Sequence, residues 1–390
     1  MPEATSTLRV GIAGLGAVSG QVLRAFSGVA GVSLAAAADL RPDARDAFTK
    51  RRGLPAFDSV EAMCRSSDID AVWIATPNYL HAEHSIIAAE NGKHVLCEKP
   101  IAVTLAECDR MIDAAEHSRV RLLAAHSKIF DTPVQAMRRI IASGRLGNVV
   151  QINSLMFNDW MQRPRLPAEV DTARGGGVVF RQAPHLVDIV RYLGGGMVRS
   201  VRASTGKWDK NFATEGNFTT LLEFADGAVA SIGFTGYGHF DVTELTWGIS
   251  VYGDQKPDPR AAAKRPRRAG TTTVEDKFAN PAFPESDAPA KAPKRMPFFG
   301  LTIVSCERGA IRQSPDGLYV YDDTGCEEVA VPPNPERAAE LIELRDALAE
   351  NRAVFPDGRW GAATLEVCRA IIDSAERKCD VPLERQVPGP

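Results

Sequence analysis

A glycine-rich turn near the amino terminus is the first feature of the sequence with recognisable chemistry. The segment VGIAGLGAVS, residues 10–19, closes an apolar run and opens a helical pattern. In this context Gly14 permits a tight turn and Gly16 lets a pyrophosphate approach the backbone. The amide groups of the helix amino terminus then point toward the phosphates. Ser19 replaces the usual third glycine, and any tight strand-to-helix turn favours glycine, so the turn alone is compatible with dinucleotide binding or with a purely structural role.

A carboxylate about 20 residues further on strengthens the dinucleotide interpretation. Asp39 ends the second apolar run, where its carboxylate can accept hydrogen bonds from the two hydroxyls of an adenosine ribose. This position favours NAD over NADP. Two alternatives stay open, because Asp39 can instead cap the helix that begins near Pro42, and Arg41 can accommodate a 2′-phosphate.

The elements around these residues follow the order of an α/β domain. In the first third of the chain, short apolar runs alternate with amphipathic stretches, which predicts a doubly wound parallel sheet of the Rossmann type. We expect strands at 8–13, 32–39, 71–76, 94–98 and 121–126, and helices at 17–27, 42–52, 80–91 and 105–117.

A change of pattern near residue 145 predicts a second, α+β domain. Apolar and polar residues alternate at 149–155, 218–224, 229–234 and 318–321, as in half-buried strands of an open, mainly antiparallel sheet. We therefore expect a dinucleotide-binding domain at 1–126 and a substrate-binding and oligomerisation domain at 127–390. A segment rich in Pro, Ala and basic residues, 253–297, contains the run KRPRR. This run can bind an anionic partner, but its prolines and low hydrophobicity favour a solvated surface insertion.

Composition narrows the class of protein. The 390 residues contain 46 Lys+Arg and 49 Asp+Glu, and 44% of them are hydrophobic, which are ordinary globular proportions. The nearly balanced charge argues against a nucleic-acid or membrane partner. No signal peptide or long apolar run is evident, so we expect a cytoplasmic protein. The seven cysteines are scattered without a C-x-x-C pair, which indicates reduced thiols and no metal site.

Two short motifs follow later strands, at the edge where open α/β sheets bind ligands. They are TPN at 76–78 and EKP at 98–100. The run from 73 to 100, WIATPNYLHAEHSIIAAENGKHVLCEKP, resembles the Gfo/Idh/MocA oxidoreductase family, in which a Rossmann domain carries a TPN-like turn and an E-K-P loop. The triple glycine at 175–177, His185 and the DGRWG run at 357–361 extend the resemblance over most of the chain.

The resemblance implies hydride transfer with NAD, or alternatively NADP, bound by the first domain. In the family, the lysine of the E-K-P loop lies beside the nicotinamide and the reacting carbon. By resemblance Lys99 is a catalytic residue, because an ammonium stabilises the oxygen as carbonyl character develops. An exposed lysine at a strand end is the alternative. The residues expected to bind the cofactor are Gly14, Gly16, Ala17, Val18, Asp39, Arg41, Thr76, Pro77, Asn78, His81, Glu98 and Lys99.

The resemblance also places a second catalytic residue and a departure from the family pattern. His185 follows the triple glycine at the family spacing, so it is expected to take the hydroxyl proton, with a buried structural histidine as the alternative. The family commonly has an aspartate four residues before this histidine, whereas this chain has Arg181. A guanidinium presents a planar fork to a carboxylate, which points to an anionic substrate. The expected substrate-binding residues are Arg163, Arg165, Arg181, Gln182 and His126, although some of the arginines can instead pair with Asp159, Glu169 or Asp171.

One branch of the family shows the same departure. The segments 163–196, 235–241 and 303–309 resemble phthalate 4,5-dihydrodiol dehydrogenases, which implies oxidation of a carboxylated aromatic cis-dihydrodiol to a catechol. The alternatives are a sugar or cyclitol dehydrogenase, a redox-neutral NAD-dependent hydrolase or lyase, and a cofactor-binding regulator without turnover. The resemblance further implies a homodimer or homotetramer built on the open sheet.

Overall fold

The computed structural model describes residues 7–16, 18–264, 270–273, 276–277, 295–335 and 337–390. Ala17 and much of the 253–297 segment, including most of its KRPRR run, lie outside the described residues. The described chain forms two compact units. The first contains the residues up to 127 together with 337–365, and the second contains 128–277, 295–335 and 366–390.

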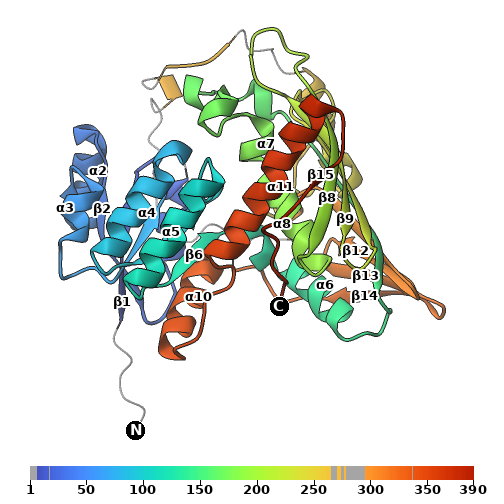
Figure 1. Ribbon diagram of the computed structural model, residues 1–390, viewed down its shortest axis with the longest axis horizontal. Helices are drawn as coiled ribbons and strands as arrows, with labels where there is room; N and C mark the ends of the chain where they lie inside the picture. Colours follow the sequence, from blue (N-terminus) through green and yellow to red (C-terminus); the bar gives the residue numbers. More distant parts are fainter. Residues whose placement is uncertain (1–6, 17, 265–269, 274–275, 278–294, 336) are drawn as a thin grey trace. The chain divides into compact units, whose positions relative to one another are not determined.

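The first unit is built on a six-stranded sheet in the order β3-β2-β1-β4-β5-β6. Figure 1 labels β1, β2 and β6 of this sheet together with the helices α2 to α5. Every neighbouring pair is parallel, which confirms the predicted Rossmann sheet. Its strands are β1 (Leu8–Ala13), β2 (Val32–Ala38), β3 (Ala56–Phe57), β4 (Ala71–Ile74), β5 (His94–Glu98) and β6 (Leu122–Ala125). Its helices are α1 (Ser19–Ala25), α2 (Pro42–Arg52), α3 (Val60–Cys64), α4 (His81–Glu90), α5 (Leu105–His117) and α10 (Ala338–Ala349).

Burial of both faces of the six-stranded sheet explains why its strands are continuous apolar runs in the sequence. Val10 and Ile12 of β1, Trp73 of β4 and Leu96 of β5 are fully buried in one hydrophobic core. Because the strands are parallel, their carboxyl ends share one edge of the sheet. The glycine-rich turn, Asp39, the TPN turn and the EKP loop all follow at that edge.

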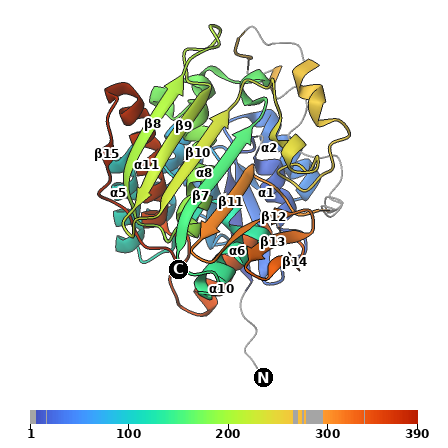
Figure 2. The same ribbon diagram turned by 90° about the vertical axis from the view of Figure 1, so that its right-hand side faces the viewer.

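The second unit is built on a nine-stranded sheet in the order β14-β13-β12-β11-β7-β10-β9-β8-β15 (Figure 2). Only the pair β7 and β10 is parallel, so the prediction of a mainly antiparallel sheet is confirmed. The strands are β7 (Val149–Phe157), β8 (Val198–Gly206), β9 (Asn217–Phe224), β10 (Val229–Thr235), β11 (Leu301–Cys306), β12 (Gly309–Ser314), β13 (Gly317–Asp322), β14 (Gly325–Ala330) and β15 (Val381–Pro382). The longer helices are α6 (Thr132–Ala142), α8 (Ala183–Leu193) and the carboxyl half of α11 (Gly358–Arg377).

The two faces of this larger sheet differ. Helices α6 and α8 pack on one face, where Ile152, Phe218 and Ile232 are fully buried. On the other face Leu155 and Leu221 remain 37% and 43% exposed. Apolar side chains on an open sheet face suit a protein partner, and the homo-oligomer expected from the sequence stays a prediction.

The structure also describes the thiols and the helices that bear on a membrane-spanning segment. All seven cysteines are free thiols, as their spacing indicates. Among the described helices, none combines the length and apolar character that crossing a bilayer requires.

Candidate active site

The glycine-rich turn joins β1 to α1, and its backbone contacts demand a glycine at position 14. Gly14 has a φ of +95°, and a Cβ there would lie 2.8 Å from the carbonyl oxygen of Ala75. At Gly16, by contrast, a Cβ would meet nothing within 4 Å. Ser19 is fully buried and its hydroxyl donates to the Gly16 carbonyl at 2.5 Å, so a serine fits where a third glycine is usual. Val18 is the N-cap residue of α1.

The two glycines predict separable effects of mutation. Gly14→Ala is expected to destabilise the protein by about 1–3 kcal/mol, because it forces a left-handed backbone and a clash with Ala75. Gly16→Ala is expected to leave stability unchanged and to weaken NAD binding, since its methyl group fills open space that a pyrophosphate would approach. Thermal unfolding and NAD titration of both variants measure the difference. Equal melting temperatures for the two variants would contradict this division of roles.

Asp39 holds the glycine-rich turn and Arg41 together. One carboxylate oxygen accepts from the Leu15 amide at 2.8 Å, and the other accepts from the Arg41 amide at 2.9 Å and its Nε at 3.1 Å. Arg41 also donates to the Leu15 carbonyl at 3.0 Å. Helix α2 begins without a side-chain cap, so the helix-cap alternative for Asp39 does not hold. Arg41 Nη2 also donates to the Asp39 carboxylate at 3.3 Å. Four donors therefore fill the acceptor positions of the carboxylate, which number about four, and binding of ribose hydroxyls requires Arg41 to give up part of these contacts.

This arrangement predicts how cofactor preference responds to one substitution. Asp39→Asn keeps an acceptor for the Leu15 amide and removes the negative charge that opposes a 2′-phosphate beside Arg41. We expect kcat/KM with NAD to fall and that with NADP to rise, changing their ratio by about 10- to 100-fold, the effect of one charged hydrogen bond. Steady-state kinetics with both cofactors measure the ratio. An unchanged ratio would remove Asp39 from cofactor selection.

His81 links the TPN turn to the EKP loop. Its ring is 1% exposed, with Nδ1 lying 2.7 Å from the Pro100 carbonyl and Nε2 lying 2.8 Å from the Thr76 carbonyl. Both partners can only accept, so both contacts are satisfied together when each ring nitrogen carries a proton. The Thr76 hydroxyl lies 3.0 Å from Nδ1 of His84, and burial lowers the pKa of His84. His81 therefore positions two motifs that the sequence assigned to the cofactor.

Glu98 is anchored inside the first unit. Its Oε1 accepts from the Trp73 indole at 3.2 Å and from the guanidinium of Arg337. Arg337 also lies over the Trp73 ring, 5.0 Å from its centroid, and 3.2 Å from buried Glu340. These contacts fix the start of the EKP loop. Arg337 is the N-cap residue of α10 and lies 239 residues downstream of Glu98, so the local motif gives no signal for its contact.

The remaining predicted residues of the first unit lie at the ends of its strands. Lys99 follows β5 directly and is half-buried, while Pro77 is exposed and Asn78 is buried in the short turn after β4. His126 follows β6 and is 2% exposed. These positions match the sheet edge at which parallel α/β folds bind ligands; the assigned roles stay predictions.

His185 lies in the first turn of α8 in the second unit. Its ring is half-buried and packs on Phe299, with 4.5 Å between ring centroids. Lys128 lies on the same phenylalanine, 6.0 Å from its centroid, and pairs with Asp131 at 3.0 Å. One turn after His185, buried Asp188 acts electrostatically on Arg191, whose pKa burial lowers to about 10. The imidazole is thus held by packing on an aromatic ring, which the sequence did not indicate.

Arg165 and Arg181 converge on one carboxylate. Arg181 Nη2 lies 3.1 Å from Oε1 of Glu169, and Arg165 Nη1 lies 4.0 Å from the same oxygen. The ammonium of Lys277 contacts the other carboxylate oxygen. We call these four residues, Arg165, Glu169, Arg181 and Lys277, the cationic cluster. Their side chains are 12%, 12%, 27% and 12% exposed, so the cluster is a largely buried group that contains three cations and one carboxylate.

Burial and the mutual charges of the cationic cluster shift the pKa values of its members. Burial lowers the pKa of Arg165 to about 9, and the charges of Arg181 and Arg163 act in the same direction. Burial likewise lowers the pKa values of Arg181 and Lys277. Burial acts to raise the pKa of Glu169, but the charges of Arg181 and Lys277 outweigh it and hold that pKa below its usual range. Burial of three cationic side chains beside one carboxylate is a setting that favours the binding of an anion.

Two other predicted substrate residues face different partners. Arg163 is 53% exposed and pairs with Asp159 at 2.8 Å, which matches the surface-pair alternative considered for the arginines. Gln182 donates from its side chain to the Arg181 carbonyl at 3.0 Å. The sequence named Glu169 only as a pairing partner, and nothing in it singled out Lys277.

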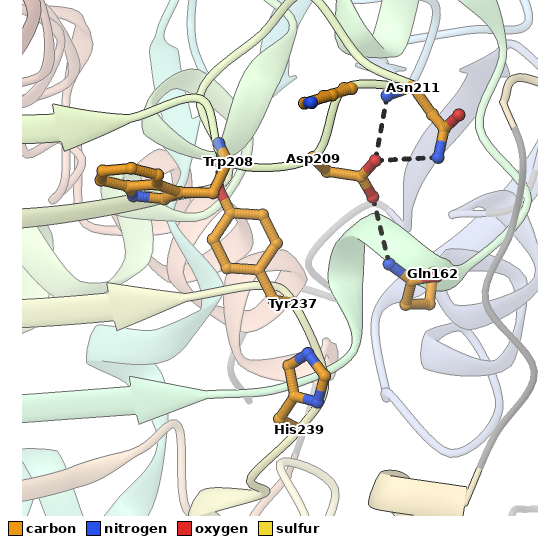
Figure 3. Close-up of a pocket in the computed structure, with 7 residues that line it drawn as sticks. Gln162, Trp208, Asp209, Asn211, Tyr237 and His239 are labelled. Carbon is orange, nitrogen blue, oxygen red and sulfur yellow. Dashed lines mark hydrogen bonds between the residues drawn. The ribbon is translucent and has the colours of Figure 1, made fainter.

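A hollow of about 530 Å³ opens beside this segment (Figure 3). Tyr237, His239 and the 77% exposed Trp208 contribute rings to it. Asp209 accepts from both the amide and the side chain of Asn211 at 3.0 Å. The lining of the hollow contains one carboxylate, that of Asp209, and one ammonium, that of Lys210. Their charges balance, so we do not expect the hollow to select anions. Within the described chain, no group of three or more His, Cys, Asp or Glu residues is placed to hold a metal ion.

The fold and the first unit define an oxidoreductase with an NAD-binding Rossmann domain. Residues 8–126 match the NAD-binding Rossmann-fold domain of the Gfo/Idh/MocA oxidoreductase family, and residues 134–256 match a C-terminal domain of that family. The chain belongs to the Gfo/Idh/MocA family. The glycine-rich turn and Asp39 fit the pyrophosphate and ribose of NAD respectively.

Relatives and solved structures extend this assignment. The chain is 33% identical over 95% of its length, and 95% of the relative, to a 1-carboxy-3-chloro-3,4-dihydroxycyclohexa-1,5-diene dehydrogenase of Comamonas testosteroni. It is 30% identical to an inositol 2-dehydrogenase of Rhizobium meliloti over 58% of this chain and 68% of that protein. A crystal structure from Bordetella bronchiseptica RB50, for which dehydrogenase activity has been suggested, superimposes with a TM-score of 0.88 at 34% identity, covering 97% of this chain and all of that one.

Proposed function

We propose that this protein oxidises a carboxylated cyclic cis-diol with NAD, in the manner of a dihydrodiol dehydrogenase that forms a catechol. The observation that carries the proposal is the cationic cluster, in which Arg181 ends the short helix α7 (Gly177–Arg181) four residues before His185. Two largely buried guanidinium groups and one ammonium around a single carboxylate favour an anionic substrate over a neutral sugar. The Comamonas relative supports it, because its name specifies a ring that bears both a carboxylate and two hydroxyls.

The proposed mechanism divides the work among residues of this chain. When bound, NAD supplies the hydride acceptor. Arg165 and Arg181 bind the substrate carboxylate by charge-assisted hydrogen bonds, while Glu169 keeps their guanidinium groups in place. His185 accepts the hydroxyl proton, and the Lys99 ammonium stabilises the oxygen as it becomes a carbonyl. Oxidation of one hydroxyl group gives a hydroxy-enone, which tautomerises to a catechol. One diol and NAD+ therefore give one catechol, NADH and a proton.

A turnover assay tests the proposal. Purified protein is mixed with NAD, then NADP, and either a carboxylated aromatic cis-dihydrodiol, myo-inositol or a hexose, and NADH is followed by its ultraviolet absorbance. We expect NADH with the carboxylated diol only. Turnover confined to inositol or hexoses would overturn the proposal in favour of a polyol dehydrogenase.

One alternative has specific support among the relatives. A 2,7-anhydro-N-acetylneuraminate hydratase of Escherichia coli is 33% identical over 45% of this chain, and a hydratase makes no net change in oxidation state. Product formation without net NADH would favour a redox-neutral reaction of this kind.

A further inference from the structure

Glu215 is a buried carboxylate that the proposed mechanism does not use. It lies in the connection between β8 and β9 and is 1% exposed. Its Oε1 accepts from the Val179 amide at 3.1 Å, and its Oε2 accepts from the hydroxyls of Thr172 and Thr214, both at 2.9 Å. One carboxylate therefore joins the turn at Thr172–Arg174, the first turn of α7 and the connection between β8 and β9.

Helix α7 begins at a residue that cannot cap it. The N-cap residue is Gly176, which lacks the side-chain oxygen that commonly accepts from an amide in the first turn. Such amides have no acceptor within the helix itself. Val179 is the third residue of α7, and Glu215 supplies the oxygen for its amide from 36 positions further along the chain. Glu215 thus takes the place of the missing N-cap side chain.

The last residue of the triple glycine makes room for this carboxylate. Gly177 has a φ of +80°, and a Cβ there would collide with Oε1 of Glu215 and with the hydroxyl of Thr214. A side chain at position 177 would have to push the carboxylate away from the Val179 amide. The glycine and the distant glutamate therefore belong to one arrangement.

Backbone hydrogen bonds connect the start of α7 to His185. The Val178 carbonyl accepts from the Gln182 amide at 2.8 Å, and the Gln182 carbonyl accepts from the His185 amide at 3.2 Å. Arg181 is the last residue of α7 and directly precedes Gln182, the N-cap residue of α8 (Figure 1). With five residues, α7 is only about one and a half turns long, so its first turn cannot shift without moving its last residue.

We propose that Glu215 is a positioning residue that caps α7 and thereby holds Arg181 and His185 in the orientation that substrate binding and proton transfer require. The inference rests on the proposed function, which assigns anion binding to Arg181 and proton acceptance to His185. Glu215 acts through α7 and takes no part in proton or hydride transfer.

The variants Glu215→Ala and Glu215→Gln test the inference on NAD-loaded enzyme. In the alanine variant, kcat/KM for a carboxylated diol is expected to fall about 100-fold, the effect of misplacing a reacting group by about 1 Å. Glutamine keeps an oxygen for the Val179 amide, and the threonine hydroxyls can turn to accept from its NH2 group, so activity is expected to stay within about threefold. The Kd of NAD should change by about twofold or less in both variants. Full activity in Glu215→Ala, or an equal loss in Glu215→Gln, would overturn the role of Glu215.

A spectroscopic signal reports the position of His185 without turnover. Its ring lies 4.5 Å from that of Phe299, centroid to centroid, so the aromatic ring current shifts the NMR signals of the imidazole protons. With 13C-labelled histidine, the signal is assigned by its absence in His185→Gln. We expect it to move in Glu215→Ala and to stay in place in Glu215→Gln. Glu307→Ala is the matched control and should leave it in place, because Glu307 also accepts from a distant backbone amide of the same unit, that of Asn148 at 2.9 Å.

Gly177→Ala tests the contact from the other side. Its methyl group displaces the carboxylate, so the variant is expected to lose activity and to move the His185 signal as Glu215→Ala does. Combining the two substitutions should be no worse than the more damaging one alone, since both break the same contact. Additive losses would contradict the inference. Glu215→Asp, which withdraws the carboxyl group by one methylene, replaces the alanine variant if that variant fails to fold.

The outcomes also separate this inference from the proposed function. If no carboxylated diol is oxidised but the His185 signal moves in Glu215→Ala and not in Glu215→Gln, the inference stands and the proposed reaction falls. If the diol is oxidised and Glu215→Ala changes neither kcat/KM nor the signal, the reaction stands and the inference falls.

Discussion

Replacing Lys99 with methionine is expected to lower kcat by about 10²- to 10⁴-fold, the range typical of a lost proton-transfer or charge-stabilising group. Lys99 directly follows β5 at the ligand-binding edge of the Rossmann sheet and is half-buried. Methionine keeps much of the apolar stem and removes only the ammonium, so NAD affinity and folding are expected to persist. Single-turnover NADH formation and an NAD titration on the same sample measure the two effects.

A lysine elsewhere in the first unit provides the control. Lys50 is an exposed residue in the last turn of α2, and Lys50→Met should retain both activity and NAD binding. A Lys99→Met variant with wild-type kcat would remove Lys99 from the chemistry. Loss of NAD binding together with activity would leave Lys99 only the cofactor-binding role that the resemblance also implies, and would remove the catalytic role.

The fold was predictable where burial leaves a periodic pattern. Strands such as β1 and β5 are buried on both faces and read as apolar runs, and α5 begins with a capping box at Thr104 and Glu107 that marks its start. In the first unit, the elements that the sequence did not predict were short. Strand β3 has two residues and helix α3 has five. Neither is long enough for the hydrophobic periodicity of a strand or of a helix to be recognised.

The candidate site was predictable to the extent that its determinants are local. The glycine-rich turn, Asp39 and Arg181 are visible in the sequence because each stands at a fixed offset from a recognisable motif. The partners that give them their environment come from distant segments. Arg337 holds Glu98 from 239 residues away, and Lys277 reaches Glu169 from 108 residues away, and no local spacing encodes either contact. For His81 the motif was visible in the sequence, but the two backbone carbonyl groups that its ring contacts were not.

Burial, which depends on distant segments, distinguishes the roles of the arginines. The sequence has four arginines between 163 and 181, of which only Arg181 stands at a motif position, and the structure separates the others by burial. Arg163 is exposed beside Asp159, whereas Arg165 is largely buried and lies over the Trp160 ring at 4.0 Å. A desolvated cation binds an anion more strongly than an exposed one, because water screens the exposed charge. Substrate selection is therefore expected to depend on Arg165 and Arg181 much more than on Arg163.

Replacing Arg181 with glutamine is expected to lower kcat/KM for a carboxylated diol by about 100-fold, since it truncates one partner of a largely buried charge interaction. A neutral cyclic diol, which has no carboxylate to bind, should lose little. Arg181→Asp installs the residue common elsewhere in the family and is expected to abolish the carboxylate preference, because it places a second negative charge near Glu169, only 3.1 Å from the present guanidinium. Arg199→Gln breaks an exposed pair with Glu223 and should change neither substrate, as expected for a solvated ion pair. If Arg181→Gln weakens neutral and carboxylated diols equally, the arginine supports the local fold of α7 and α8 and does not bind the anion.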